Sequence, residues 1–191
     1  MKTKIRLVLL LAVLLCVSGC KPGTESKETT PVESRAEVFE KTFGDFTTQD
    51  ISGNPADSSV FKDYKLTMVN IWATYCSPCI REMPGLANLN KKYADKGFRV
   101  VGIVTDVCNS AFQPTPSKME TAGDIIELTG ADYLHLIPSR SLVIAHLSQC
   151  ASVPETVFVD SEGNRVAEIY AGSRAEEEWD VIIKDLLEKA E

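Results

Sequence analysis

The feature that most constrains this chain is a pair of cysteines, Cys76 and Cys79, at the junction of two regular patterns. Residues 67–72 form a short apolar run of strand-forming residues, which is typical of a buried strand. Residues 78–94 have a helical pattern and are followed by Gly97, a stop signal. The two cysteines therefore lie where a buried strand passes into a helix.

This position predicts a reactive thiol at Cys76. Unpaired backbone N–H groups and the helix dipole stabilise negative charge at a helix start. They lower the pKa of a thiol from about 8.5 toward ~7 or below. The thiolate is the species that attacks disulfides. Cys79 lies one helical turn further on, so we expect it to be shielded and to act as the resolving thiol.

Three other roles are alternatives to redox exchange for this pair. A zinc site needs further ligands, but there is no second C-x-x-C, and Cys108, Cys150, His135 and His146 lack paired spacing. A purely structural disulfide across so few residues gains little loop-closure entropy. A haem-attachment motif needs histidine at position 80, which is Ile80. The sequence thus predicts redox cysteines, with no metal and no cofactor.

The rest of the chain from residue 38 to residue 191 reads as one domain in which strands alternate with helices. We expect further strands at residues 43–46, 50–54, 99–105, 133–137, 155–160 and 165–170, and further helices at residues 118–128, 139–147 and about 176–187. The last helix has the clearest apolar face. This order predicts a single mixed-sheet α/β layer structure.

The first 19 residues are typical of a secretory signal peptide. Lys2, Lys4 and Arg6 give a positive start, and the apolar stretch that follows is too short for a bilayer span of roughly 20 residues. Residues 17–20 resemble the lipobox of bacterial lipoproteins, in which the peptidase cuts before a cysteine that carries diacylglycerol. That resemblance implies that Cys20 anchors the chain to the extracytoplasmic face of the bacterial cell membrane.

Residues 20–37 are rich in Lys, Glu, Ser, Thr and Pro, so we expect a flexible tether there. The first 19 residues hold three of the 20 Lys and Arg residues and none of the 27 acids. The remainder therefore has a formal charge of −10. Such an acidic balance argues against binding nucleic acid, which needs basic patches.

Residues 70–79, followed by Arg81-Glu82-Met83-Pro84, resemble the TlpA/ResA branch of the thioredoxin superfamily. The likeness extends from about Phe43 to the end of the chain. It implies a thioredoxin-like α/β fold, with a central mixed β-sheet flanked by helices. It also implies a thiol–disulfide oxidoreductase that exchanges disulfides with exported proteins, together with a membrane thiol electron donor or acceptor.

The resemblance assigns roles to residues outside the cysteine pair. Val153 and Pro154 fit the family's cis-proline loop, where the backbone of Val153 would bind a substrate strand by β-augmentation. Pro84 matches the proline that kinks the first main helix. Glu82 stands where a family glutamate moves protons for the thiols, although an exposed surface glutamate is an equal alternative.

The motif itself contains further residues that we expect to support the site, namely Trp72, Tyr75 and Pro78. Tyr75 departs from the commoner tryptophan and is expected to provide apolar surface. Asn70 stands where cytoplasmic thioredoxins carry a buried acid, so one proton acceptor for the resolving thiol is missing. The two histidines are expected to serve the fold rather than catalysis.

Four cysteines remain once Cys16 leaves with the signal peptide and Cys20 is lipidated. Cys108 follows the predicted strand at residues 99–105, and Cys150 lies four residues before Pro154. In a thioredoxin fold both of these loops approach the edge of the sheet that carries the active-site disulfide. The two cysteines could form a second disulfide, remain as two reduced thiols, or act as an auxiliary redox pair, and the sequence leaves these alternatives open.

Two other functions stay as alternatives to the exchange enzyme. One is a thioredoxin-like lipoprotein that docks a partner without turnover, which would have no need of Cys76 and Cys79. The other is a peroxidase of the peroxiredoxin type, for which Thr74 is the one matching residue. Reduction is the favoured direction of exchange, but Ser77 and Pro78 do not decide it.

Overall fold

A five-stranded mixed sheet organises residues 42–190, the part of the chain that this computed structural model describes. The strands lie in the order β5 (Leu134–Leu136), β4 (Phe98–Val104), β3 (Leu66–Trp72), β6 (Glu155–Val159) and β7 (Tyr170–Ala171). Strands β3, β4 and β5 are parallel, whereas β6 runs antiparallel to β3 and β7 antiparallel to β6. The predicted mixed α/β sheet is confirmed. The predicted signal peptide, lipidated Cys20 and tether lie outside the described residues.

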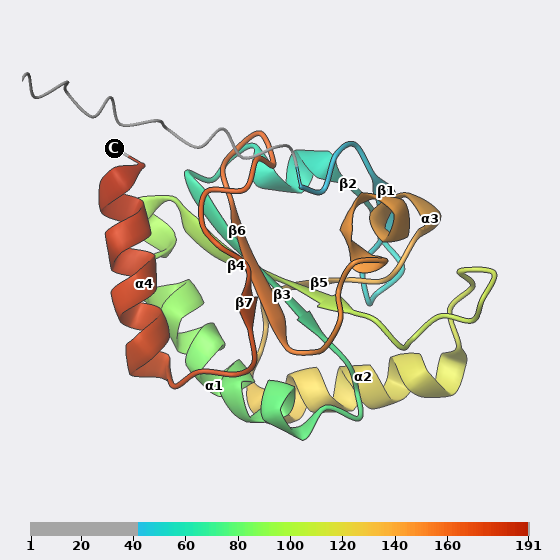
Figure 1. Ribbon diagram of the computed structural model, residues 1–191. Helices are drawn as coiled ribbons and strands as arrows, with labels where there is room; N and C mark the ends of the chain where they lie inside the picture. The colour runs from blue at the N-terminus through green and yellow to red at the C-terminus, as the bar shows by residue number, and fades with distance from the viewer. Residues whose placement is uncertain (1–41, 191) are drawn as a thin grey trace, which may run out of the picture. The chain divides into compact units, whose positions relative to one another are not determined.

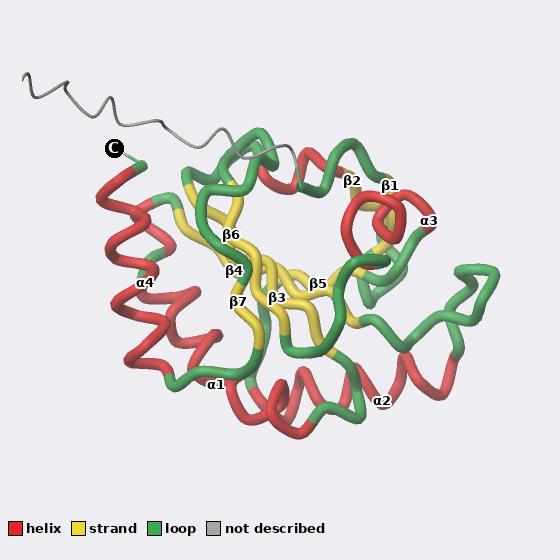
Figure 2. The backbone as a smooth tube through the Cα atoms, in the orientation of Figure 1, coloured by secondary structure: helices red, strands yellow, loops and turns green. Residues whose placement is uncertain are grey.

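Helical segments cover both faces of the sheet (Figures 1 and 2). The long helices α1 (Ser77–Lys92), α2 (Pro116–Thr129) and α4 (Glu176–Lys189) pack on one face, and the 3-10 turn η2 (Ala94–Lys96) follows α1. The other face carries the hairpin of β1 (Thr47–Gln49) and β2 (Pro55–Asp57), the 3-10 turn η1 (Ser58–Phe61), α3 (Arg140–Leu142) and the short π-helix η3 (Val143–Leu147). None of the helices within residues 42–190 is both long and apolar enough to cross a bilayer.

Strand β3 is buried along its whole length because both of its faces are covered. Successive side chains of a strand point to opposite faces. Met68 and Trp72 accordingly pack in the core beneath α1 and α4, while Val69 and Ile71 pack in the second core with Phe43. The near-continuous apolar run that predicted this strand is what a doubly covered strand requires.

The N-terminal hairpin corrects the sequence-based strand assignment. The strands are residues 47–49 and 55–57, so the strand expected at residues 43–46 is not formed. Residues 50–54 form the turn between the two strands rather than a strand. The carboxylate of Asp50 fixes this turn, since its Oδ1 accepts the backbone N–H groups of Ser52 and Asn54 at 2.9 and 2.8 Å. Asp and Asn side chains favour turns because they bond to nearby backbone in this way.

The C-terminal hairpin is also shorter than expected. Of the predicted second strand, residues 165–170, only Tyr170 pairs with β6 as part of a strand, and Arg165 forms an isolated bridge with Val159. The Tyr170 ring packs edge-on against Trp179 of α4, with ring centroids 5.5 Å apart. This segment is therefore held by contacts with the helix in addition to its strand pairing with β6. The predicted terminal helix is confirmed, with Trp179 and Ile183 buried.

Gly102 in the middle of β4 lies opposite His135 of β5 at very close range. A Cβ atom at position 102 would lie 2.2 Å from His135 Nδ1. The histidine cannot withdraw freely, because its Nδ1 accepts the indole N–H of Trp72 at 3.2 Å. The glycine therefore makes room for the ring that holds Trp72 at the end of β3.

We predict that Gly102→Ala destabilises the protein by about 1–3 kcal/mol, because the added methyl overpacks a closed core. Gly123→Ala in α2 is the matched control: nothing lies within 4 Å of its added methyl, and alanine favours a helix over glycine by about 1 kcal/mol. Urea unfolding of both variants measures the difference. Equal stability of the two alanine variants would contradict the close packing described here.

Candidate active site

The two motif cysteines form a disulfide at the first turn of α1. Cys76 is the N-cap residue of the helix, and the backbone N–H of Cys79 points to Cys76 Sγ at 3.2 Å. Cys76 is 6% exposed whereas Cys79 is completely buried. An incoming thiol or disulfide can therefore reach Cys76 and not Cys79. The arrangement provides an accessible sulfur with a helix N-terminus aimed at it and a shielded partner.

The first turn of α1 is built to favour negative charge on that sulfur. It contains no acidic residue, and Pro78 occupies an early helical position where a backbone N–H would have no helical partner. The unpaired N–H groups at a helix start stabilise an anion, and a thiolate at Cys76 is placed to receive that stabilisation.

Asp106 holds the loop that leads into Cys76, and sequence reasoning missed it. Its Oδ1 accepts the backbone N–H of Thr74 at 2.9 Å, and its Oδ2 accepts the Thr74 hydroxyl at 2.6 Å. Lys118 of α2 lies 3.9 Å from the same carboxylate. The available signal was its place directly after the predicted strand at residues 99–105, because parallel neighbouring strands end at the same edge of a sheet.

The proline loop lies beside this cysteine loop. The Val153–Pro154 peptide bond is cis, which confirms the expectation from the family resemblance. Pro154 is buried, Val153 is partly exposed, and Val153 lines a cavity of about 330 Å³ together with Tyr75. Tyr75 is 74% exposed, so it supplies apolar surface next to Cys76 as expected. The binding of a substrate strand by Val153 stays a prediction.

Cys108 and Cys150 line the same cavity and are free cysteines, so the second disulfide considered from the sequence is not formed in the structure. Each thiol donates to a different backbone carbonyl: Cys108 to Pro138 at 3.8 Å and Cys150 to Ser152 at 3.4 Å. Burial raises the pKa of Cys108. Burial, followed by the negative charge of Glu155, raises the pKa of Cys150 to about 11. Both thiols therefore stay protonated at neutral pH and are weak nucleophiles.

Glu82 is buried, so the alternative of an exposed surface glutamate is wrong. It lies three residues after Cys79 on the same helix, which places both on one face of α1. Its carboxylate accepts hydrogen bonds from Asn70 Nδ2 at 3.0 Å, from the backbone N–H of Arg174 at 3.1 Å and from Trp179 Nε1 at 3.2 Å. Burial raises the pKa of Glu82, against the lowering effect of these donors. Proton movement between Glu82 and the thiols stays a prediction.

Trp72 and Pro84 lie in the strand and the helix on either side of the cysteines. Trp72 is buried at the end of β3 and donates to His135. Helix α1 continues past Pro84, which lies on its exposed side, through to Lys92. The kink at Pro84 that the family resemblance implies stays a prediction.

Both histidines serve the fold, as expected. His135 Nε2 lies 3.0 Å from the carbonyl oxygen of Ala131 and its Nδ1 accepts from Trp72, so one neutral tautomer satisfies both bonds. Burial lowers the pKa of His135 to about 4. His146 bonds through Nε2 to Glu155 Oε1 at 2.7 Å, which ties η3 to the start of β6 beside the cis-proline.

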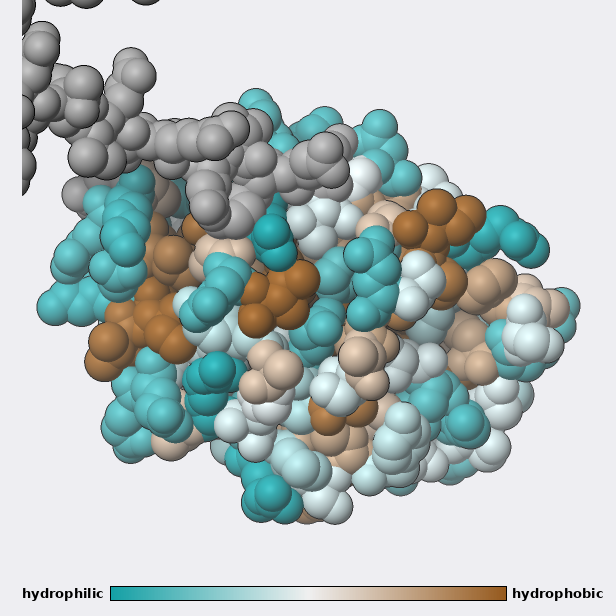
Figure 3. Space-filling view, viewed as in Figure 1, coloured by the Kyte–Doolittle hydropathy of each residue, from teal (hydrophilic) through white to brown (hydrophobic). Residues whose placement is uncertain are grey.

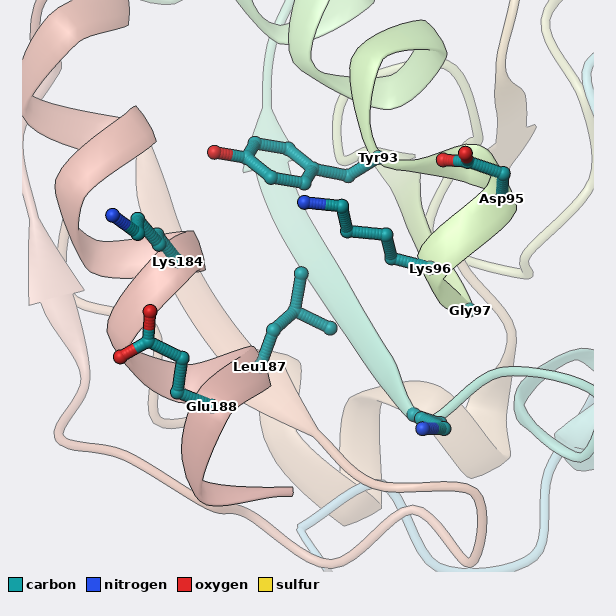
Figure 4. Close-up of a pocket in the computed structure, with 8 residues that line it drawn as sticks. Tyr93, Asp95, Lys96, Gly97, Lys184, Leu187 and Glu188 are labelled. Carbon is teal, nitrogen blue, oxygen red and sulfur yellow. The ribbon is translucent and has the colours of Figure 1, made fainter. Parts of the chain in front are cut away.

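A second cavity lies far from the active-site disulfide. A cavity of about 590 Å³ at the far end of α1 is lined by Lys65, Tyr93, Asp95, Lys96, Gly97, Lys184, Leu187 and Glu188 (Figure 4). A 16-residue helix separates it from Cys76 by about 24 Å. Figure 3 shows apolar surface over the region of α3 and η3. Ile144 of η3 is 71% exposed. Among residues 42–190, no group of three or more His, Cys, Asp or Glu side chains could hold a metal ion.

The chain is similar in sequence to known proteins. The redoxin family profile matches residues 40–181. The thiol-disulfide oxidoreductase ResA of Bacillus cereus is 25% identical over 191 residues, covering 96% of this chain and 98% of its own length. The thioredoxin-like protein YneN of Bacillus subtilis is 28% identical over 136 residues, covering 71% of this chain and 73% of its own length.

A solved structure supports the same conclusion about the fold. A thiol:disulfide interchange protein of the thioredoxin family from Chlorobium tepidum superposes with a TM-score of 0.62 at 24% identity. The match covers 75% of this chain and 93% of the other. The predicted thioredoxin-like fold is thereby confirmed.

We predict that stability falls between pH 6.5 and about 4 because of His135. The unfolded chain takes up a proton there, with a pKa near 6.5, while the buried ring does not until about pH 4. The loss amounts to about 3 kcal/mol across that window. His135→Asn offers an oxygen in place of Nδ1 and cannot titrate, so its stability should fall less. Urea unfolding at pH 7.5 and 4.5 measures both slopes, and equal slopes would contradict the assignment.

Proposed function

This chain belongs to the redoxin family and is a thiol–disulfide oxidoreductase of the ResA-like thioredoxin branch, and we propose that it works outside the bacterial cytoplasm on exported proteins. We propose further that a lipid on Cys20 holds it at the extracytoplasmic face of the cell membrane. The observation that carries the exchange reaction is the accessible Cys76 sulfur at the start of α1, bonded to the buried Cys79.

The proposed cycle begins with the reduced protein. The Cys76 thiolate attacks one sulfur of a substrate disulfide, a mixed disulfide forms, and one substrate thiolate leaves. The Cys79 thiol loses its proton and attacks Cys76 Sγ, which closes the Cys76–Cys79 disulfide and releases the second substrate thiolate. Two electrons have passed to the substrate. A membrane thiol electron donor then returns the enzyme disulfide to two thiols.

Two neighbours assist these steps in the proposal. Glu82 accepts the proton of Cys79, because it lies on the same helix face and its pKa is raised by burial. Val153 binds an extended substrate segment through its backbone, beside the cavity that it shares with Tyr75. Glu82 lies on the helix that begins at the disulfide, and Val153 lies in the loop before β6.

Reduction is the direction that we propose. An oxidant of this class needs its reduced form stabilised as a thiolate. Here Cys79 is fully buried and has an acid, Glu82, one turn away, so the reduced pair gains little stabilisation beyond the helix start at Cys76. The burial of Cys79 beside Glu82 is the observation that supports reduction over oxidation.

We predict that Cys76→Ser abolishes the reduction of insulin disulfides, because it removes the attacking sulfur. Cys79→Ser should accumulate a mixed disulfide with substrate, since nothing resolves it. Cys108→Ser is the matched control and should retain activity, because that thiol is free and protonated. Insulin turbidity and non-reducing electrophoresis measure these outcomes. Full activity of Cys76→Ser would refute the mechanism.

We predict that the wild-type chain partitions into the detergent phase and that Cys20→Ala remains soluble or unprocessed. The expectation follows from the lipobox-like residues 17–20, because lipid chains on one cysteine give stable anchoring. Cys16→Ala is the control, since that residue lies within the predicted signal peptide. If wild type and Cys20→Ala both fractionate as soluble protein, Cys20 is not the anchor.

A further inference from the structure

We propose that Asn70 is a positioning residue that turns its side-chain amide over when Glu82 gains or loses a proton. The inference rests on the proposed function only for its use in exchange, where Glu82 accepts the proton of Cys79. Its structural part stands on the hydrogen bonds between β3, β6, α1 and the C-terminal segment.

Asn70 is a fully buried polar residue of β3, the strand that leads to the cysteine loop. It is completely buried in β3, in register with Gly102 of β4 on one side and Thr156 of β6 on the other. Its side chain is on the α1 side of the sheet, since it bonds to Glu82 of that helix. A polar group enclosed in this way is costly unless its hydrogen bonds are made.

The amide of Asn70 is only half satisfied. Its Nδ2 donates to Glu82 Oε1 at 3.0 Å and to Thr156 Oγ1 at 3.2 Å. Its Oδ1 is buried and has no hydrogen-bond partner among residues 42–190. The present orientation therefore serves a Glu82 carboxylate that accepts, and it leaves the amide oxygen unpaired.

The carboxyl group of Glu82 has room for a proton on one oxygen only. Its Oε2 accepts from the backbone N–H of Arg174 and from the indole N–H of Trp179. Neither donor can become an acceptor. A proton on Glu82 must therefore reside on Oε1, where it would face the Asn70 NH₂ group, a donor against a donor.

A 180° rotation of the Asn70 side-chain amide removes the contact between these two donors. Asn70 Oδ1 then accepts from the protonated Oε1 and from the Thr156 hydroxyl, which can donate as well as accept. The Nδ2 group takes the place that Oδ1 now occupies without a partner. Each orientation leaves one amide atom unpaired, so the proton on Glu82 decides between them. Glu82 gains or loses one proton, no other covalent bond changes, and the hydrogen bonds of Asn70 to Glu82 and to Thr156 reverse their direction.

Few charges face this pair. The guanidinium of Arg174 lies over the rings of Tyr170 and Trp179, at 4.8 and 4.9 Å, and favours the carboxylate. The buried Tyr133 hydroxyl is also close enough to be affected, and burial and then Glu82 raise its pKa. His135 stacks on Tyr133 and is neutral above about pH 4. In the reduced protein Cys79 titrates as well, so the oxidised protein isolates Glu82.

The test is a titration of the oxidised full-length protein by nuclear magnetic resonance. The ¹³C resonance of the Glu82 carboxyl and the ¹⁵N resonance of the Asn70 amide are followed against pH. We expect the Asn70 resonance to change with the same midpoint as Glu82. An Asn70 amide that stays constant while Glu82 titrates overturns the proposal, and this measurement needs no variant that could fail to fold.

A second experiment titrates Glu82 in the Asn70→Leu variant. The variant loses the stronger hydrogen bond to the charged carboxylate and the weaker one from the neutral acid, so Glu82 should titrate at higher pH than in wild type. Asn90→Leu, on the helix that carries Glu82, is the matched control. Asn90 Oδ1 accepts the Val100 N–H at 2.7 Å, so its loss affects stability and not the Glu82 midpoint. An unshifted Glu82 midpoint in Asn70→Leu would also overturn the proposal.

The titration separates this inference from the proposed function. If the amide follows Glu82 but insulin is not reduced, the positioning role stands and the exchange reaction fails. If insulin is reduced but the amide does not follow Glu82, the exchange reaction stands and the positioning role is wrong.

Discussion

The chemistry of this site depends first on the contact between the Cys79 N–H and the Cys76 sulfur. This contact makes the reactive sulfur the cap of α1, so the helix start is satisfied by the very atom that performs the exchange. The contact exists because β3, buried on both faces, ends at a fixed edge of the sheet and passes into the helix within a few residues. Asp106, at the end of the neighbouring strand, fixes the loop between them.

A buried polar layer then couples this helix to the rest of the domain. Glu82 receives donors from β3, from the segment before α4 and from α4 itself. A buried acid without such partners would be strongly destabilising. The same donors that make the acid tolerable also fix which of its oxygens can bind a proton. Stability and proton handling are therefore set by one group of contacts.

The cysteines show how strongly the local environment decides thiol chemistry. Cys76 lies at a helix start that favours the thiolate, whereas Cys108 and Cys150 are held protonated by burial although they line a cavity beside the site. Equal side chains within one region of the molecule thus have different reactivity. The acidic neighbour Glu155 adds to the effect at Cys150.

The sequence by itself determined the features that depend on neighbours along the chain. The buried strand, the helix start at Cys76 and the amphipathic final helix follow from local patterns, and the family likeness supplied the cis bond before Pro154. Local patterns erred at residues 50–54, where one Asp side chain selects a turn. The tertiary structure alone decided the burial of Glu82, whose partners Arg174 and Trp179 lie 92 and 97 residues away, and the separate carbonyl partners of Cys108 and Cys150. Hydrogen bonds and burial across such separations depend on how the layers pack, which no local pattern encodes.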